Sequence, residues 1–456
     1  VLYWQLLLFR YGGSIDRKMS LYTQFVAGVF FPIHESLKGH ETVRVRREME
    51  KSQWLEPEQI EALQTENLRR FLSSVDHHVS CYRELFEKLG FSASDIMCLE
   101  DLQKLPLADK SFIRTNLEQL RADNAAGLSR FNTGGSSGEP LIFYIGKERV
   151  SHDVAAKWRA TRWWGVDIGD PEIVVWGSPI ELGTRDRVRQ LRDWVLRTRL
   201  LPAFEMSKGK LDSFIRTICA IRPKMLFGYP SALSLIASHA EQQDIRMDDL
   251  GIKVAFVTSE RLYDHQREKI QAVFGCPVAN GYGGRDAGFI AHQCKEGGMH
   301  ITAEDIIVEI VDKEGKVLPK GEIGEIVVTH MATQDFPFIR YRTGDIGALS
   351  PERCSCGRGL PLLKEIQGRS TDFVIAHDGT ILHGLALIYV LRDLTGVKEF
   401  KIIQESIDHT RVQIVKEDGY QPDSELIIQA EFKKRLGENV VVHVEYRDEI
   451  KSEKSG

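Results

Sequence analysis

The stretch FNTGGSSGEPLIF, residues 131–143, marks the point where the chain changes from a helical pattern to an alternation of strands and helices. Before it, residues 41–125 predict one helix after another, because apolar residues recur at helical spacing. After it, short apolar runs bounded by Gly, Pro or Ser predict buried strands, with helices between several of them. This alternation predicts an α/β fold whose sheets are largely parallel.

Two later regions depart from that alternation. Residues 305–350 predict antiparallel strands joined by turns at Glu-Gly and Lys-Gly pairs. The residues that follow GRSTDFV (368–374) predict a smaller α+β unit with the order helix, strand, strand, helix, strand. We therefore expect a large domain over residues 19–370 with a helical start, mixed sheets and a β-rich subdomain, and a small domain over 371–456.

The composition is that of an ordinary globular protein. The 456 residues are 42% hydrophobic and 27% charged, which disfavours extensive disorder. A net charge of −5 argues against a nucleic-acid partner, because such proteins usually carry a basic excess. The seven cysteines do not form the even set of a disulfide framework, so we expect a reducing, cytoplasmic setting.

The N-terminus gives no sign of a membrane span. Residues 1–10, VLYWQLLLFR, are apolar but too short to cross a bilayer, and they lack the features of a signal peptide. A more regular pattern starts at Met19, so we interpret residues 1–18 as an upstream extension of doubtful status. The segment LYTQFVAGVFFPI (21–33) fits a helix packed on the domain, and also fits an interfacial helix that touches lipid.

The loop inside the opening stretch suits a polyphosphate. Thr133, Ser136, Ser137 and Gly138 belong to a run of small and hydroxyl-bearing residues directly before an apolar strand. Glycines let backbone N–H groups approach phosphate oxygens, and hydroxyls add donors. The loop is not a Walker motif, since no Gly-Lys-Ser/Thr follows. Taken alone, it also fits a flexible connector.

Three further motifs carry polar side chains on predicted turns. GYGGRDAGFIAHQC (281–294) offers Asp286 to a divalent metal. YRTGDIGAL (341–349) offers Asp345 to a pair of ribose hydroxyls. GRSTDFV offers Arg369 to a phosphate or ribose oxygen through charge-assisted contacts. Each of them, taken alone, also fits an ordinary turn.

The order of these motifs resembles the adenylate-forming superfamily. A Ser/Gly/Thr loop is followed by Ser-Glu, YGxxD, YxTGD and GRxxD, as in acyl-CoA synthetases and adenylation domains. Further stretches look similar to the phenylacetate–CoA ligase branch, with its coenzyme F₃₉₀ synthetase and CapK relatives. They are HVSCYRELFEKLG, LPLADKSFIRTN, LFGYPSAL, TSERLYDHQREKIQAVFG and CSCGRGLPLLKEIQGR.

The resemblance implies a role for each motif residue. Thr133, Ser136, Ser137 and Gly138 would hold the ATP phosphates. Asp286 would bind Mg²⁺, although the branch usually has the longer Glu there. Arg369 would contact ribose or phosphate and act in catalysis, and Asp345 would bind ribose. The residues that would frame the adenine and the acyl-adenylate are Ser259, Glu260, Gly281, Tyr282 and Gly283.

The resemblance also implies a two-step reaction. A carboxylate attacks the α-phosphate of Mg·ATP, and a thiol, most plausibly of CoA, then displaces AMP. The small domain would act as a lid that turns about a hinge near residues 370–372 between the two steps. Alternatives remain open: an amine, a carrier-protein thiol or a cofactor hydroxyl as acceptor, or a non-catalytic nucleotide-binding protein. A homodimer is also left open.

Four cysteine and histidine side chains form a candidate zinc set. Cys294 and His300 lie in CKEGGMH, and Cys354 and Cys356 lie in CSCG. Three thiolates and one imidazole make an ordinary closed tetrahedral site, and some relatives look similar there. Free thiols are the alternative, and His292 and His330 are substitute ligands.

Two more expectations concern the substrate and the C-terminus. Trp176, Tyr229, Phe256 and Tyr282 lie on or beside the expected acyl pocket, which favours an aromatic acid. The resemblance also implies a catalytic lysine directly after the final SEKSG. Lys451 and Lys454 are nearby but out of register. We therefore expect this chain to bind ATP and to form the adenylate poorly.

Overall fold

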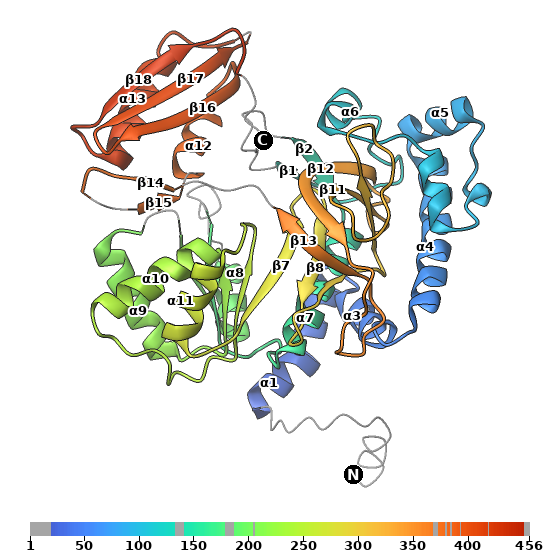
Figure 1. Ribbon diagram of the computed structural model, residues 1–456, viewed down its shortest axis with the longest axis horizontal. Coiled ribbons are helices and arrows are strands. Elements are labelled where there is room, and N and C mark those ends of the chain that lie inside the picture. The colour runs from blue at the N-terminus through green and yellow to red at the C-terminus, as the bar shows by residue number, and fades with distance from the viewer. Residues whose placement is uncertain are drawn as a thin grey trace.

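The computed structural model describes residues 20–132, 141–177, 187–203, 206–367, 373–378, 381–383, 385–392, 394–417 and 419–450. Figure 1 shows a large body that contains the central sheet and a smaller unit, drawn in red, beside it. The predicted α/β class is confirmed, as is the helical start. No helix among the described residues is long and apolar enough to span a bilayer.

Helices make up the start of the chain. The first three segments are contiguous, and Ser20 caps their N-terminus by accepting a hydrogen bond from the backbone N–H of Thr23 over 3.0 Å. The last helix of this group, α7, begins shortly after the strand Ile142–Ile145. The helical segments are α1 (Leu21–Phe25), the π-helical η1 (Val26–Phe30), α2 (Phe31–Leu37), α3 (Thr42–Ser52), α4 (Pro57–His78), α5 (Ser80–Leu89), the 3₁₀ segments η2 (Ala93–Asp95) and η3 (Leu99–Lys104), α6 (Lys110–Thr115) and α7 (Lys147–Trp163).

One half of the central sheet is parallel. Its strands lie in the order β7-β6-β5-β3-β4, and helices connect them along the chain. Helices α9, α10 and α11 cover it through a core that includes Phe214, Ile236 and Phe274. The elements are β3 (Glu172–Trp176), α8 (Arg187–Leu196), β4 (Thr198–Pro202), α9 (Lys208–Ile221), β5 (Met225–Gly228), α10 (Pro230–Gln242), β6 (Val254–Thr258), α11 (Asp264–Phe274) and β7 (Val278–Gly284).

The other half of the sheet is antiparallel, as the sequence predicts for residues 305–350. It continues in the order β10-β11-β12-β13-β9-β8, so that β8 joins the parallel half at β7. A separate hairpin, β1 (Ser129–Asn132) with β2 (Ile142–Ile145), lies ahead of it. The strands are β8 (Gly288–Gln293), β9 (Met299–Ile301), β10 (Ile306–Val311), β11 (Gly324–His330), β12 (Phe338–Leu349) and β13 (Leu362–Gln367).

The C-terminal unit has a core of its own. Its three-stranded sheet has the order β16-β17-β18, and the buried residues beneath it, such as Val412 and Phe432, all come from this unit. The proposed domain boundary at 370/371 lies outside the described residues. The elements are β14 (Phe373–Ile375), β15 (Ile381–His383), α12 (Leu385–Arg392), β16 (Val397–Ser406), β17 (His409–Lys416), α13 (Ser424–Leu436) and β18 (Val441–Tyr446).

Candidate active site

The predicted site residues gather at the carboxyl ends of the parallel strands. Trp176 ends β3, Tyr229 follows β5, Ser259 follows β6, and Gly281 to Gly283 lie in β7. Next to β7 the sheet changes from parallel to antiparallel pairing. In open α/β sheets, ligands bind at this edge and near such a change of strand order.

A tyrosine–carboxylate pair links β7 to β12. The hydroxyl of Tyr282 donates a hydrogen bond to the carboxylate of Asp345 over 3.0 Å. Burial, together with the charge on Asp345, raises the pKa of Tyr282, so this phenol remains a donor. Three strands lie between β7 and β12 in the sheet. Because Tyr282 on β7 still reaches Asp345 on β12, the sheet must bend between them.

Asp345 lies on a bulge within a strand, and the predicted turn after a strand is wrong in this detail. Glu325 pairs with Ile346 and Val327 pairs with Arg342, so residues 343–345 all lie opposite Ile326. The backbone of Gly344 has φ of +78°, a conformation that favours glycine. The bulge leaves the Asp345 carboxylate partly exposed at the edge of the site.

A second tyrosine–carboxylate pair holds the predicted magnesium ligand. The hydroxyl of Tyr341 donates to Asp286 over 2.8 Å, and the backbone N–H of Ala287 donates to the other carboxylate oxygen over 3.1 Å. Tyr341 is fully buried, whereas Asp286 is partly exposed. A carboxylate has about four acceptor positions, so oxygen lone pairs remain for a cation.

Arg149 of α7 fixes the turn that carries Asp286. Its two terminal nitrogens donate to the carbonyls of Arg285 and Asp286, each over 3.0 Å. Its Nε donates to Asp153 over 3.0 Å. Burial opposes the ionisation of Asp153, but Arg149 and His330 outweigh it and lower the pKa of Asp153 to about 2.

Ser259 and Glu260 occupy the loop after β6. Ser259 has φ of +71°, which is unusual for a residue with a side chain. The Glu260 carboxylate accepts a hydrogen bond from the hydroxyl of Ser231, and another from the backbone N–H of Ser231 over 3.3 Å. Ser231 lies in the first turn of α10, so Glu260 fixes that helix end beside the strand edge.

The four aromatic residues predicted for the acyl pocket have different surroundings. The rings of Trp176 and Tyr229 stack with centroids 4.4 Å apart and planes within 17°. Phe256 is buried in the core under Gly281, where a Cβ atom would lie 2.9 Å from the Phe256 ring. The absence of a side chain at Gly281 therefore leaves room for that ring.

Several predicted residues lie outside the described residues. They are Thr133, Ser136, Ser137, Gly138, Arg369, the hinge at 370–372, Lys451 and Lys454. The strands that flank the first loop are described, and Asn132 pairs with Ile142.

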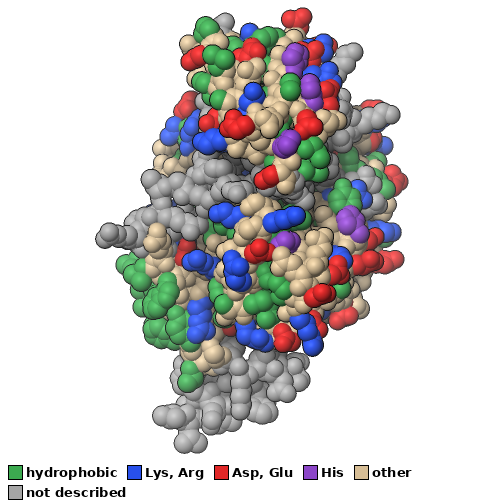
Figure 2. Space-filling view, turned by 90° about the vertical axis from the view of Figure 1, so that its left-hand side faces the viewer, with side chains coloured by type: hydrophobic (Ala, Val, Ile, Leu, Met, Phe, Trp, Pro, Cys, Tyr) green, Lys and Arg blue, Asp and Glu red, His purple; other side chains and the backbone are tan. Residues whose placement is uncertain are grey.

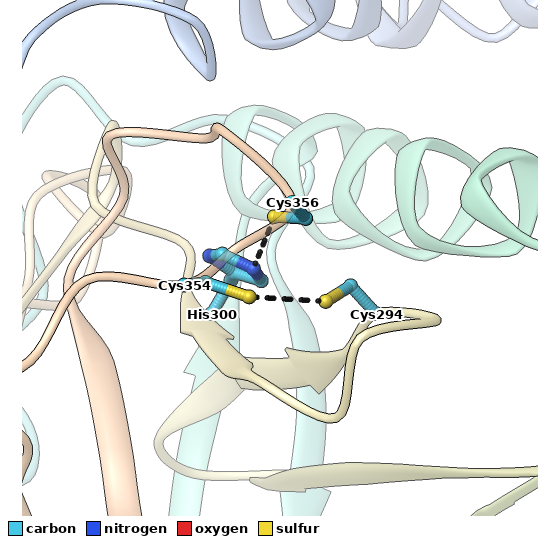
Figure 3. A group of neighbouring side chains, drawn as sticks. All are labelled: Cys294, His300, Cys354 and Cys356. Carbon is cyan, nitrogen blue, oxygen red and sulfur yellow. Dashed lines mark hydrogen bonds between the residues drawn. The ribbon is translucent and has the colours of Figure 1, made fainter.

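The four predicted zinc ligands converge. Their ligand atoms all lie within 4.8 Å of one another, and Figure 3 shows the side chains directed toward a common point. The sulfurs of Cys294 and Cys354 are 3.5 Å apart, and the Cys356 sulfur lies 3.2 Å from Nε2 of His300. A tetrahedral zinc with bonds of about 2.0–2.3 Å needs ligand atoms about 3.3–3.8 Å apart. The two short separations lie close to this range and the widest is at most 4.8 Å, so the set has about the size that such an ion needs.

Local turns and charges suit this cluster to a metal. Gly297 and Gly357, both with positive φ, close the turns that follow Cys294 and Cys354. Burial lowers the pKa of His300 to about 4, and Arg358 acts in the same direction, so the imidazole is neutral. At Cys356 burial raises the pKa, but contacts with Arg358 outweigh it and lower the pKa.

The two substitute ligands have other surroundings. The His292 ring stacks on Phe289 with centroids 5.6 Å apart. Nε2 of His330 lies 3.7 Å from the Asp153 carboxylate. Neither belongs to the metal-binding group found among the described residues.

Three residues that support the site were not predicted from the sequence. Tyr341 lies in the motif YRTGDIGAL, and its place four residues before Asp345 is the one signal that could have identified it. The other two are Arg149 and Glu325. Glu325 accepts a hydrogen bond from the backbone N–H of Gly344 over 3.3 Å. Neither residue has a local sequence signal, because their partners are distant in sequence.

Two family models match the chain. One, described as AMP-binding enzyme, covers residues 200–333, and the other, described as CapK C-terminal domain, covers residues 374–456. Similar proteins include Protein CapK of Staphylococcus aureus, 25% identical over 86% of this chain and 87% of the relative. The phenylacetate-coenzyme A ligase of Thermus thermophilus is 25% identical over 84% of this chain and 85% of its own.

A solved structure shares the fold. The crystal structure of 2-hydroxyisobutyryl-CoA ligase with 2-HIB-AMP and CoA in the thioesterification state matches with a TM-score of 0.63. The match covers 89% of this chain and 90% of that one, at 19% sequence identity. At this identity, the similarity supports the fold alone.

Proposed function

We infer that the chain belongs to the adenylate-forming superfamily, in the branch of phenylacetate–CoA ligases and CapK, and from this premise we propose that it is an AMP-forming acid–thiol ligase. A carboxylate oxygen attacks the α-phosphorus of ATP, and the bond to pyrophosphate breaks. The sulfur of CoA then attacks the acyl carbon, and AMP leaves. The first step makes an unreactive carboxylate into a good acyl donor.

The Tyr282–Asp345 pair is the observation that carries this proposal. A partly exposed carboxylate, with one oxygen already held by a phenol, still has lone pairs for two ribose hydroxyls. It lies beside the carboxyl ends of the parallel strands, where the backbone of Gly283 is partly exposed. Nucleotide binding there would place the α-phosphate near Asp286.

We assign Asp286 to Mg²⁺. The ion would reduce the charge repulsion between the phosphates and the incoming carboxylate. The turn is fixed by Tyr341 and Arg149, so the short aspartate side chain starts from one position. This preorganisation compensates for the reach that the usual glutamate would have.

We assign a structural zinc to Cys294, His300, Cys354 and Cys356. Four protein ligands leave no position for water or substrate, so the ion would tie the β8–β9 turn to the loop before β13. We further propose that residues 19–370 and 371–456 are separate domains, with a hinge near 370–372 and residues 1–18 as an extension. The separate core of the C-terminal unit supports this division.

The stacked pair of Trp176 and Tyr229 supports an aromatic acid as substrate. Flat rings at the strand edge offer a planar, apolar surface, which suits an aryl group better than a long flexible chain. Phe256 supports the pocket only from beneath, because it is fully buried.

A second candidate keeps the adenylation and changes the acceptor. The match of residues 374–456 to the CapK C-terminal domain favours this alternative, because in the two-step reaction the small domain faces the acceptor. An amine, a carrier-protein thiol or a cofactor hydroxyl would then replace CoA. The third candidate is a nucleotide-binding protein without catalysis. It rests on Asp286, whose side chain is shorter than the Glu that the branch usually has there.

Carboxylate-dependent exchange of pyrophosphate with ATP, measured on the full-length gene product, tests these candidates. Exchange with an acid from a panel of aryl, hydroxy and fatty acids supports a ligase, and AMP release on adding CoA identifies the acceptor. Exchange that needs an acid but gives no CoA product supports another acceptor. ATP binding without exchange for any acid contradicts the ligase and supports the binding protein.

A further inference from the structure

The helix from Leu21 to Leu37 leaves an apolar face uncovered. Among the Asp, Glu, Lys and Arg residues, only Glu35 occurs in this stretch, and it is buried, where it accepts a hydrogen bond from the hydroxyl of Thr42 over 2.6 Å. Five apolar side chains of this stretch are exposed to solvent. Their exposed fractions are 84% for Leu21, 55% for Phe25, 46% for Val29, 56% for Ile33 and 84% for Leu37.

The π-helical turn keeps these five side chains on one side. They are spaced four residues apart, and in a regular α-helix such positions drift by about 40° around the axis at each step. Residues Val26–Phe30 form a π-helical segment, which holds more residues per turn than an α-helix. Each residue of this segment therefore rotates less about the axis, and this offsets part of the drift. A rare backbone feature thus produces a straight apolar row on the surface.

Helix α8 extends this face. The hydroxyl of Tyr22 donates to the carbonyl of Val195 over 2.8 Å, and Val195 packs against the core beneath the first helix. On the outer side of α8, Leu191 and Trp194 are 62% and 74% exposed. The seven exposed side chains are called the apolar face below, and Figure 2 shows apolar side chains gathered at the left edge of the large body, with Lys and Arg beside them.

The border of the apolar face is basic. The stretch 187–200 contains five arginines and one aspartate, in a chain whose net charge is −5. Arg197 and Arg199 are exposed, and the Arg197 guanidinium lies 4.0 Å from the Tyr22 ring centroid. Lys38, directly after Leu37, is exposed as well.

We propose that the apolar face binds the surface of a bilayer that contains anionic lipids. Apolar side chains with an exposed tryptophan would enter the boundary of the acyl chains, and the arginines would meet lipid phosphates. The charge distribution favours lipid over a second copy of the chain. A two-fold dimer built on this face would bring two basic borders into one interface, where like charges repel.

Vesicle co-sedimentation of the full chain tests the proposal. We expect sedimentation with vesicles of phosphatidylcholine and phosphatidylglycerol, and much less with phosphatidylcholine alone or at high salt. The double variant Phe25→Ser/Ile33→Ser should lose at least about tenfold in vesicle affinity. Arg199→Gln should weaken binding to the anionic vesicles only.

Controls separate lipid binding from other causes. Leu426→Ser changes an apolar side chain that is 68% exposed on α13, outside the apolar face, and should bind like the parent. Leu21→Ser/Leu37→Ser, at the two most exposed positions, repeats the test if the first pair unfolds. The proposal is overturned if the parent does not sediment with anionic vesicles or if both face variants bind as well as the parent. A dimer in light scattering that these variants dissociate, without vesicle binding, would instead make the face a contact between copies.

Discussion

Tyr341 donates a hydrogen bond of 2.8 Å to Asp286, although β13 and β9 lie between β12 and the β7–β8 hairpin in the sheet. The phenol is fully buried, and the carboxylate that it holds is partly exposed. One strand therefore supports both carboxylates of the site, because Asp345 lies four residues after Tyr341.

Tyr341→Phe removes this hydrogen bond and keeps the ring in place. We expect a higher Mg²⁺ concentration for half-maximal pyrophosphate exchange, because the Asp286 carboxylate loses its fixed orientation. A loss of about 1–2 kcal/mol corresponds to roughly a tenfold shift. Tyr282→Phe is the matched control, since it loosens Asp345 and should raise the apparent ATP constant. If Tyr341→Phe needs the same Mg²⁺ concentration for half-maximal exchange as the parent, the assignment of Asp286 to Mg²⁺ is contradicted.

Asp345→Ala should weaken ATP and AMP binding while the protein stays folded. Removing an acceptor of two ribose hydroxyls costs about 2–4 kcal/mol, or at least roughly 30-fold in the dissociation constant measured by calorimetry. Asp345→Asn keeps the shape and should lose less. If Asp345→Ala binds ATP as tightly as the parent, the ribose assignment is wrong.

The purified protein should contain about one zinc ion per chain. Cys354→Ser should lower the zinc content and the melting temperature by several degrees, because the ion connects two distant loops. Cys219→Ser changes a thiol of α9 that does not belong to this group, so it is the control and should change neither quantity. Metal analysis without zinc, together with reactive thiols at Cys294, Cys354 and Cys356 in the native protein, would contradict the site.

The ion pair of His152 and Asp305 predicts a loss of stability at alkaline pH. Nδ1 of His152 lies 2.6 Å from the Asp305 carboxylate. Burial lowers the pKa of His152, but Asp305 and Glu148 outweigh it and raise the pKa to about 9. Since the folded-state pKa exceeds the unfolded one, the stabilisation is complete below about pH 6.5 and is lost as the pH rises through about 9.

Chemical denaturation from pH 6.5 to 10 measures this effect. His152→Gln keeps a hydrogen-bond donor but cannot carry the charge. The difference in unfolding free energy between parent and variant should shrink by a few kcal/mol over this range. A difference that stays constant with pH would mean that His152 is not charged in the folded protein.

Much of this architecture could be predicted from local patterns. The runs that became β3, β5, β6 and the antiparallel β10–β12 were visible as buried or turn-bounded apolar segments. The convergence of three cysteines and one histidine on a group that could hold a metal was also predicted, because these residue types in short glycine-containing loops have a specific chemistry even without spacing rules. That the metal is zinc stays a prediction.

What escaped prediction depends on contacts between distant segments. The Tyr282–Asp345 and Tyr341–Asp286 bonds need a sheet that bends, and no local pattern encodes that bend. The bulge at residues 343–345 resembled a turn because both use glycine with positive φ. The π-helical turn at Val26–Phe30 gave no sequence signal, since its residues also suit an α-helix.

The separate core of the C-terminal unit has a consequence for evolution and engineering. Its buried residues, from Val374 to Val444, pack against one another, so we expect substitutions in the core of the large body to leave this packing intact. Selection can therefore change the core of this unit and the core of the large body independently. A chimaera that carries this unit from another member of the superfamily should fold, and its change in acceptor preference would reveal which half chooses the nucleophile.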